Sequence, residues 1–479
     1  MSNKNKRVYK QAINLMTAQV KKSPKISTNP QRLMQPLLNL YINLSKENPA
    51  EKLLIILFFV LPWNLGKHFE NMQSFINGKS LNYLTPTVYL QDIAVAAVVV
   101  FGIASTAKDT VTPNLLKRLF FLFPLAVFLS VFFAGRFYPS AYFFGRLLLY
   151  FLFCSASINL FRAPSVRRWF FVSIAVNLLL LCVLGFLQFY RQSSVFNNYL
   201  FFGEQPYSVF TPFISKESFN GVARIPPYAT FLHPNIFAGY LVISLTLLLG
   251  YFLSRKKRQT VPSVLFILTG AVALFLTKSY TAWTAFVLGL LLLLFVRHVL
   301  MRHIKNARLI TPVFLFLTLT IILLGLLFPF YKNRVVMLLP NDSITSTLSV
   351  ERRSALLEAS YKMLFQRPFF GWGINSFTYS FKPFYRFQER VIFNQPVHNV
   401  FALVSTETGL VGALLFLVLI FYAVYYSVRH DGFFYSVALI QIIFLSSFDH
   451  YFFTIPQTQL LFILTLMMGF TYTKENNCL

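Results

Sequence analysis

The chain is short of charge, and of acidic residues most of all. Only 12% of its 479 residues are charged, whereas soluble globular proteins average about 25%. Its 15 Asp and Glu face 43 Lys and Arg, and 56% of its residues are hydrophobic. A soluble protein of this size could not bury so much apolar surface. The composition therefore excludes a soluble globular protein and predicts one whose main solvent is lipid.

Several common sources of chemistry are also missing. The three cysteines, Cys154, Cys182 and Cys478, are scattered, which excludes a disulfide framework and a cysteine-based metal site. No P-loop, GxGxxG, HExxH or Ser–His–Asp signature occurs. Acidic residues predicted to lie outside the membrane are few and form no DxD-like pair, which disfavours a divalent-metal mechanism. We therefore expect no cofactor and no bound metal.

Apolar segments are what the chain has in abundance. Residues 1–52 form a polar, basic tail without an apolar run, so we expect no cleavable signal peptide. Beyond the tail, residues 53–473 contain twelve apolar segments, most near the roughly 20 residues that a membrane-spanning helix needs. We predict an all-α membrane protein with about 12 transmembrane helices and a long outer loop that carries an amphipathic helix. The segments are 53–66, 84–106, 115–134, 141–161, 168–190, 236–253, 262–278, 281–299, 309–330, 399–427, 433–449 and 455–473.

The basic residues predict the orientation, because cytoplasmic loops of membrane proteins are rich in Lys and Arg. With the tail inside, 26 of the 43 basic residues fall on the cytoplasmic side and 16 outside, nine of these in residues 331–398. We therefore expect a multi-pass plasma-membrane protein with both termini cytoplasmic, the second being residues 474–479. The net charge of +28 then reflects topology and contact with membrane lipids, not nucleic-acid binding.

Two predicted outer loops, residues 191–235 and 331–398, are far longer than the usual connections in helical bundles. Long loops on a rigid scaffold often carry function. In residues 351–365 apolar residues and charges alternate at helical spacing, which predicts an amphipathic helix on the outer surface. Its adjacent Arg352 and Arg353 could bind a phosphate bidentately. Contact with lipid headgroups explains them about equally well.

The histidines supply a candidate base. His398 opens the tenth apolar segment at its outer end, where an imidazole titrates near neutrality and can accept a proton. Taken alone, a structural interfacial histidine is the more common explanation. His233 lies at the end of the first long loop, after Arg224, and is a weaker candidate.

Ionisable residues within apolar segments are costly and default to functional candidates. Four occur here. We expect Asp92 and Arg146 to pair inside the bundle in a structural role. Glu407 and Asp449 could orient a base or a cation at the outer surface.

Five motifs follow one another along the chain. They are Thr230-Phe231-Leu232-His233-Pro234-Asn235; Arg353 followed by Ala359, Pro368, Gly371, Gly373 and Phe377; His398-Asn399; Glu407-Thr408-Gly409-Leu410-Val411-Gly412; and Asp449-His450-Tyr451 with Gln457-Thr458-Gln459. In this order they resemble the O-antigen ligase / O-antigen polymerase superfamily of bacterial membrane glycosyltransferases. The likeness covers roughly residues 84–473 and rests on the ordered set, since no single motif is strongly specific.

The resemblance implies a GT-C-like fold and metal-independent transfer of a glycan on the outer face of the inner membrane. The donor would be a glycan on undecaprenyl pyrophosphate, and the acceptor a hydroxyl of a glycan or glycolipid. His398 matches the family's proposed base and Arg353 its pyrophosphate-binding arginine. Arg224 and Lys278 match further family cations only loosely. We predict His398, Arg353 and Glu407 as catalytic residues, and as substrate-binding residues Arg352, Arg224, His233, Asn399, Lys278 and Asp449.

Two alternatives to a ligase stay open. A polymerase of the same superfamily is not separated from a ligase by these motifs. A transporter or flippase for a lipid-linked glycan is less favoured, because it predicts inverted repeats or broken spans near the membrane midplane. We find no such symmetry, and the unusual residues gather at one predicted face.

Overall fold

The computed structural model describes residues 48–105, 113–254, 260–301, 307–337, 344–387 and 394–471. The chain divides into two compact units, residues 1–52 and residues 53–479. Most of the predicted N-terminal tail and the whole predicted C-terminal segment 474–479 lie outside the described residues.

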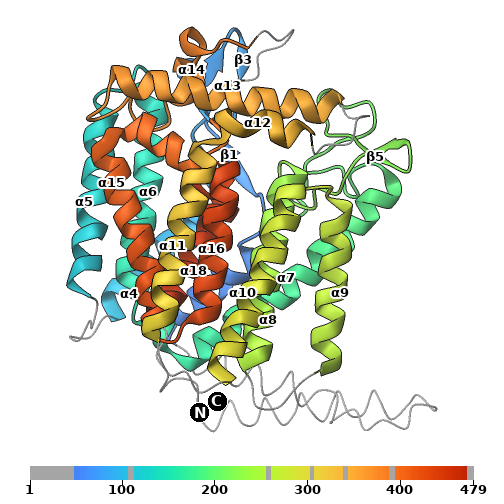
Figure 1. The fold of residues 1–479 in the computed structure, drawn as a ribbon, viewed down its shortest axis with the longest axis vertical. Helices are drawn as coiled ribbons and strands as arrows, with labels where there is room; N and C mark the ends of the chain where they lie inside the picture. Colours follow the sequence, from blue (N-terminus) through green and yellow to red (C-terminus); the bar gives the residue numbers. More distant parts are fainter. Residues whose placement is uncertain are drawn as a thin grey trace, which may run out of the picture. The chain divides into compact units, whose positions relative to one another are not determined.

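Every one of the twelve predicted apolar segments contains a helix (Figure 1). Among the described residues, α5, α6, α7, α8, α10 and α15 are long and apolar enough to cross a membrane, and α4, α9, α11 and α16 are shorter apolar helices. The number of twelve crossings therefore stays a prediction. The helices are α3 (Pro49–Val60), α4 (Leu90–Ser105), α5 (Asn114–Val131), α6 (Phe137–Ser157), α7 (Pro164–Arg191), α8 (Pro234–Ser254), α9 (Thr260–Leu276), α10 (Tyr280–Met301), α11 (Ala307–Leu326), α15 (Val400–Arg429), α16 (Phe433–Phe448) and α18 (Pro456–Thr471).

Helix α16 is largely buried and packs against α8, α10, α11 and α15. Helix α16 approaches α10 closely at Gly289. A Cβ on Gly289 would lie only 1.9 Å from Nε2 of Gln441. The same amide donates a hydrogen bond of 2.8 Å to the backbone oxygen of Ala285. Side-chain bonding to backbone thus ties the two helices together in an otherwise apolar core.

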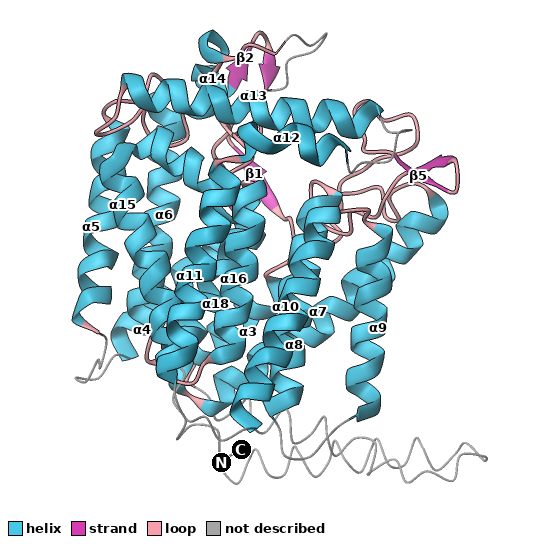
Figure 2. Ribbon diagram, viewed as in Figure 1, coloured by secondary structure: helices cyan, strands magenta, loops and turns pink. Residues whose placement is uncertain are grey.

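Three short antiparallel strand pairs lie in the loops at one end of the helices (Figure 2). They were not expected from the sequence, since each strand is only two or three residues long. The pairs are β1 (Gly66–His68) with β4 (Thr87–Tyr89), β2 (Phe75–Ile76) with β3 (Lys79–Ser80), and β5 (Glu217–Phe219) with β6 (Val222–Arg224). Short helical turns occur at η1 (Met72–Ser74), η2 (Leu160–Arg162), α14 (Phe377–Ser380), η3 (Lys382–Phe384) and α17 (Tyr451–Thr454).

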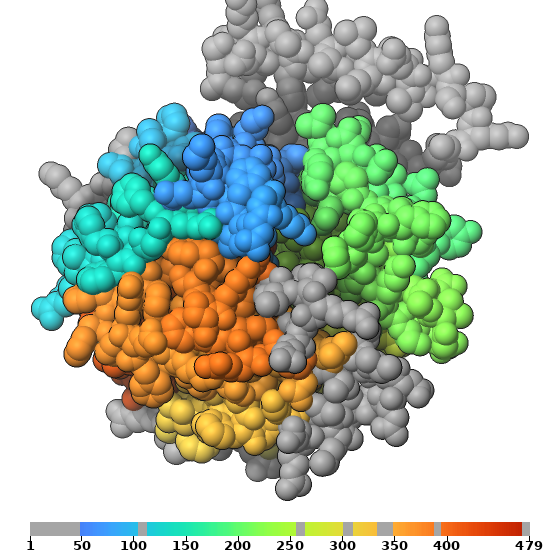
Figure 3. All heavy atoms as spheres, turned by 90° about the horizontal axis from the view of Figure 1, so that it is seen from above, coloured from blue at the N-terminus to red at the C-terminus, as the bar shows by residue number. Residues whose placement is uncertain are grey.

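The helix predicted over residues 351–365 is present within α13 (Ile344–Gln366). Together with α12 (Phe328–Met337), α13 lies across the ends of the bundle helices (Figure 1). Its apolar face, with Leu356, Leu357 and Met363, is buried, and the helix packs against α15. Seen from above in Figure 3, the orange part of the chain, which includes the end of α13, lies below the blue segment and to the left of the green one. The helix therefore roofs the bundle, and its orientation toward the outside stays a prediction.

The expected pairing of Asp92 with Arg146 is confirmed. Arg146 Nη2 lies 3.5 Å from Asp92 Oδ2, joining α6 to α4. The other carboxylate oxygen accepts a hydrogen bond of 2.9 Å from the Tyr150 hydroxyl, and Arg146 donates to the Thr87 backbone oxygen at 2.8 Å. Each buried charge is thereby offset by an opposite charge and by hydrogen bonds.

Candidate functional site

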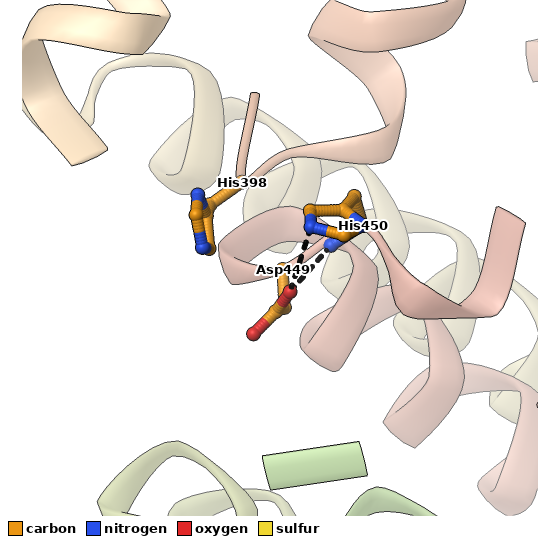
Figure 4. A group of neighbouring side chains, drawn as sticks. All are labelled: His398, Asp449 and His450. Carbon is orange, nitrogen blue, oxygen red and sulfur yellow. Dashed lines mark hydrogen bonds and ion pairs between the residues drawn. The ribbon is translucent and has the colours of Figure 1, made fainter. Parts of the chain in front are cut away.

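Two loops bring His398, Asp449 and His450 together (Figure 4). His398 stands two residues before α15. Asp449 follows the last residue of α16, where the backbone becomes extended, and His450 caps α17. The His450 backbone N–H donates to Asp449 Oδ1 at 2.8 Å, and His450 Nε2 lies 4.0 Å from the same oxygen. The rings of His398 and His450 meet edge to face, 5.2 Å apart.

Asn399 explains why His398 lies beside the end of α16. Its side-chain oxygen accepts a hydrogen bond of 2.9 Å from the Ala402 N–H, which makes it the N-cap of α15. Its amide nitrogen donates 2.8 Å to the backbone oxygen of Ser447, two residues before Asp449. Asn399 is almost fully buried. The residue predicted to bind substrate thus holds the His398 and Asp449 loops in register.

Arg353 reaches the same place from α13. Its Nη2 lies 3.9 Å from Asp449 Oδ2, and its Nη1 donates a long hydrogen bond of 3.4 Å to the Phe448 backbone oxygen. Its Nε is buried without a hydrogen-bond partner among the described residues. Arg352 is the next residue along α13 and is half-buried. We call Arg353, His398, Asp449 and His450 the His398 cluster.

The charges of the His398 cluster favour neutral imidazoles beside an ionised carboxylate. Burial lowers the pKa of His398 well below its ordinary value; Asp449 opposes the shift, and Arg353 and His450 add to it. Burial likewise lowers the pKa of His450. Burial raises the pKa of Asp449, but His398, His450 and Arg353 outweigh it and the net shift is downward. At neutral pH His398 can therefore accept a proton.

The cluster also has the donor atoms of a metal site. One atom each from His398, Asp449 and His450 lies within 4.8 Å of the others, the one such group found in the described part of the chain. Two imidazoles and a carboxylate suit zinc or a similar ion. However, Asp449 already faces the guanidinium of Arg353, which would repel a cation. The absence of a metal stays a prediction.

His233 lies beside the cluster, whereas Arg224 and Lys278 lie by a hairpin. The charge of His233 contributes to the pKa of His398. Arg224, on β6, stacks over the Phe189 ring at 5.6 Å, and Lys278 stands 4.8 Å from the Phe219 ring. These two rings touch, with centroids 5.0 Å apart. The structure thus brings Arg224 and Lys278 to one aromatic cluster at the β5–β6 hairpin, and we find no described contact from either to His398.

The Glu407 carboxylate holds a loop in place through hydrogen bonds to its backbone. Its carboxylate accepts hydrogen bonds from the backbone N–H groups of Asn375, at 2.8 Å, and Phe377, at 3.0 Å. Gly409 interrupts α15 with φ of +68°. A Cβ there would lie 2.1 Å from the Phe369 oxygen, so only glycine permits this approach. These contacts support a positioning role for Glu407, and its predicted catalytic role stays untested.

Sequence reasoning did not single out Tyr83 and Thr454, which contact the cluster. The Thr454 hydroxyl lies 2.7 Å from Nδ1 of His450, and the Tyr83 ring meets the His450 ring edge-on at 5.6 Å. The four-residue spacing from His450 could have indicated Thr454. Tyr83 stands in an irregular loop far away in the sequence, and no local signal marks it.

Comparison with known proteins places part of this site in a family. Residues 264–417 match the family model described as O-antigen ligase. No curated protein matches the chain. The matched segment holds Lys278, Arg352, Arg353, His398 and Glu407. With its apolar helices, this match indicates an integral membrane protein and, at family level, a ligase- or polymerase-type enzyme of glycosyl transfer. The match over residues 264–417 confirms the resemblance inferred from the motifs.

Proposed function

We propose that the protein is a membrane glycosyltransferase of the ligase type, acting on the outer face of the inner membrane. It transfers a glycan from an undecaprenyl-pyrophosphate carrier to a hydroxyl of a glycan or glycolipid acceptor. The observation that supports this most directly is that His398, a histidine able to act as a base, and Arg353, a loosely held arginine, both lie next to Asp449. Both residues lie in the segment that matches the O-antigen ligase family.

His398 acts as the general base in this proposal. Its imidazole takes the proton from the acceptor hydroxyl while the oxygen forms a bond to the anomeric carbon of the donor sugar. The bond from that carbon to the pyrophosphate oxygen breaks, and the carrier pyrophosphate leaves with the electron pair. Asp449 stabilises the imidazolium, since its carboxylate faces the histidine cluster. General-base catalysis of this kind contributes roughly 10²–10⁴-fold.

Arg353 stabilises the leaving pyrophosphate. Its contact to Asp449, at 3.9 Å, is longer than a hydrogen bond, and its Nε has no partner among the described residues. The guanidinium therefore keeps donors for phosphate oxygens, which it can bind bidentately. Charge that is already in place where a negative charge develops is commonly the largest catalytic contribution.

The direct test is transfer in vitro. Purified protein in liposomes is given an undecaprenyl-pyrophosphate glycan and, separately, a glycolipid acceptor or a second lipid-linked glycan. Transfer to the glycolipid supports a ligase, and elongation of the lipid-linked glycan alone indicates the polymerase alternative. We expect transfer to persist in EDTA. Loss of transfer in EDTA would contradict the metal-independent mechanism, and absence of transfer to every acceptor would contradict the proposal.

A further inference from the structure

A polar cavity of about 200 Å³ lies beside the His398 cluster. Its wall includes Thr454 and Tyr83, the two residues that contact His450. It also includes the strand β4 and the first turns of α6. None of His398, Arg353 and Asp449 lines it. The cavity is therefore next to the proposed reaction centre but separate from it.

The lining of the cavity is aromatic and polar without being acidic. Three tyrosines, Tyr83, Tyr89 and Tyr142, stand in the wall together with the amides of Gln205 and Asn375. Tyrosine offers an apolar ring face and a polar tip, and amides both donate and accept hydrogen bonds. Such a wall suits a ligand that has apolar C–H faces and many hydroxyl groups, which is the chemistry of a sugar ring.

The charge in the cavity is already compensated. Arg146 lines it, but its Nη2 pairs with Asp92 at 3.5 Å. No carboxylate stands in the wall. The cavity is smaller than the roughly 300–1,000 Å³ of pockets for drug-sized ligands. Size and charge together favour one neutral sugar residue over an oligosaccharide or an anion.

Two groups in the wall lack partners. Arg146 Nε and Gln205 Oε1 are buried atoms with no hydrogen-bond partner among the described residues, and Arg146 is only 8% exposed. A buried donor or acceptor left without a partner is costly.

Glu407 connects this cavity to the family segment. Its carboxylate accepts from the Asn375 N–H and so fixes a backbone with φ of +59°, unusual for a residue other than glycine. The Asn375 amide donates 2.9 Å to the Tyr83 backbone oxygen. The Glu407 contact therefore holds two residues of the cavity wall in place.

We infer that this cavity is a glycan subsite that binds one neutral sugar residue next to the transfer site. The inference rests on the proposed function for its role in transfer, while the binding itself does not require turnover. The sugar belongs either to the donor glycan or to the acceptor. Both sources share the same hydroxyl-rich ring, and steady-state kinetics separates them.

The test measures binding of free sugars to the full-length protein in detergent, by saturation-transfer NMR. The probes are glucose, galactose, N-acetylglucosamine and, as the anionic comparison, glucuronate. We expect at least one neutral sugar to bind, and Gln205→Leu to weaken that binding about three- to tenfold, the value of one hydrogen bond. Binding of glucuronate alone, or no neutral sugar binding, overturns the inference.

Matched variants distinguish the cavity from a general disturbance. Gln192→Leu is the control, because Gln192 bonds to the same long loop through Ile225 but does not line the cavity. We expect it to bind sugars like wild type. Tyr83→Leu removes one aromatic wall and is expected to weaken binding, with protein that still elutes as a single species. Wild-type binding by both Gln205→Leu and Tyr83→Leu overturns the inference.

Kinetics of the transfer reaction then identify the source of the sugar. A KM raised about three- to tenfold for the donor alone, or for the acceptor alone, in Gln205→Leu assigns the subsite. Unchanged KM values for both substrates overturn the inference while leaving the transferase intact. Failure of the proposed function looks different, because wild type then transfers nothing although the neutral sugar still binds.

Discussion

Two Asp–Arg pairs in the described part of this protein are held to very different degrees. Asp92 and Arg146 lie 3.5 Å apart with side chains 11% and 7% exposed, and Tyr150 completes the carboxylate. Asp449 and Arg353 lie 3.9 Å apart, and the arginine side chain is 24% exposed. The Asp92–Arg146 pair thus joins α4 to α6, whereas Arg353 remains accessible to a further partner. The shorter, more buried pair has a structural role, and the longer, more exposed pair belongs to the proposed reaction site.

The largest expected effect falls on the loosely held region. We predict that His398→Ala lowers the rate of glycan transfer by roughly 10²–10⁴-fold, the contribution of a general base. The measurement is single-turnover transfer by purified protein, with helical content followed by circular dichroism as the control for folding. A variant that transfers glycan at the wild-type rate would rule out His398 as the base.

Substitutions of Arg353 distinguish the effect of its positive charge from the effect of its planar shape. We predict that Arg353→Ala lowers the rate of transfer by about 10²–10³-fold, as loss of one preorganised donor does. Arg353→Lys should recover only part of that loss, because lysine keeps the charge but not the planar fork. Equal rates for the two variants would argue against bidentate contact with the pyrophosphate.

Substitutions in the Asp92–Arg146 pair should change the stability of the protein. Arg146→Met leaves Asp92 buried and unpaired, which we expect to cost about 3–5 kcal/mol in the free energy of unfolding. The double variant Asp92→Leu/Arg146→Met should recover most of this loss, because it removes both charges. Thermal unfolding in detergent measures the three proteins. If the double variant is no more stable than Arg146→Met, the charge pairing is not what stabilises these helices.

Much of the fold could be predicted from sequence, because a helix depends on the pattern of apolar residues within one continuous segment. Apolar runs of sufficient length predicted where each of twelve helices lies, and the alternation over residues 351–365 predicted the roofing helix. The Asp92–Arg146 pair followed from the cost of burying either charge alone. The ordered motifs predicted the family that residues 264–417 match.

Contacts between segments that are distant in the sequence could not be predicted, because no local pattern of residues indicates them. His450 lies 52 positions after His398, and only the hydrogen bond of Asn399 to Ser447 shows why their loops meet. The catalytic expectation for Glu407 came from its place in a motif, whereas its carboxylate bonds to backbone of the 371–377 loop. Arg224 and Lys278 were predicted to bind substrate, and the structure places them instead against Phe189 of α7 and Phe219 of β5.

A substitution of Glu407 distinguishes a positioning role from a catalytic one, and we expect its effect to be smaller than those above. Glu407→Gln keeps the shape of the side chain but weakens its backbone hydrogen bonds, so we expect a loss of about 1–3 kcal/mol in stability. Because Glu407 does not contact His398 in the described structure, the pH dependence of kcat/KM should keep its wild-type position. A shifted pH profile would show that Glu407 acts on the base and restore the catalytic assignment.

The smallest expected effect is a displacement of the pH profile by Asp449→Asn. The pKa of His398 is lowered by burial, with Arg353, His450 and His233 adding to the shift and Asp449 opposing it. The neutral base is therefore present at neutral pH and is lost as pH falls through the lowered pKa. Removing the Asp449 charge lowers this pKa further, so the acid limb of kcat/KM should move to lower pH even as the rate itself declines. Movement to higher pH would mean that the base titrating in the profile is not His398, and would return the loosely held pair to a structural role like that of Asp92 and Arg146.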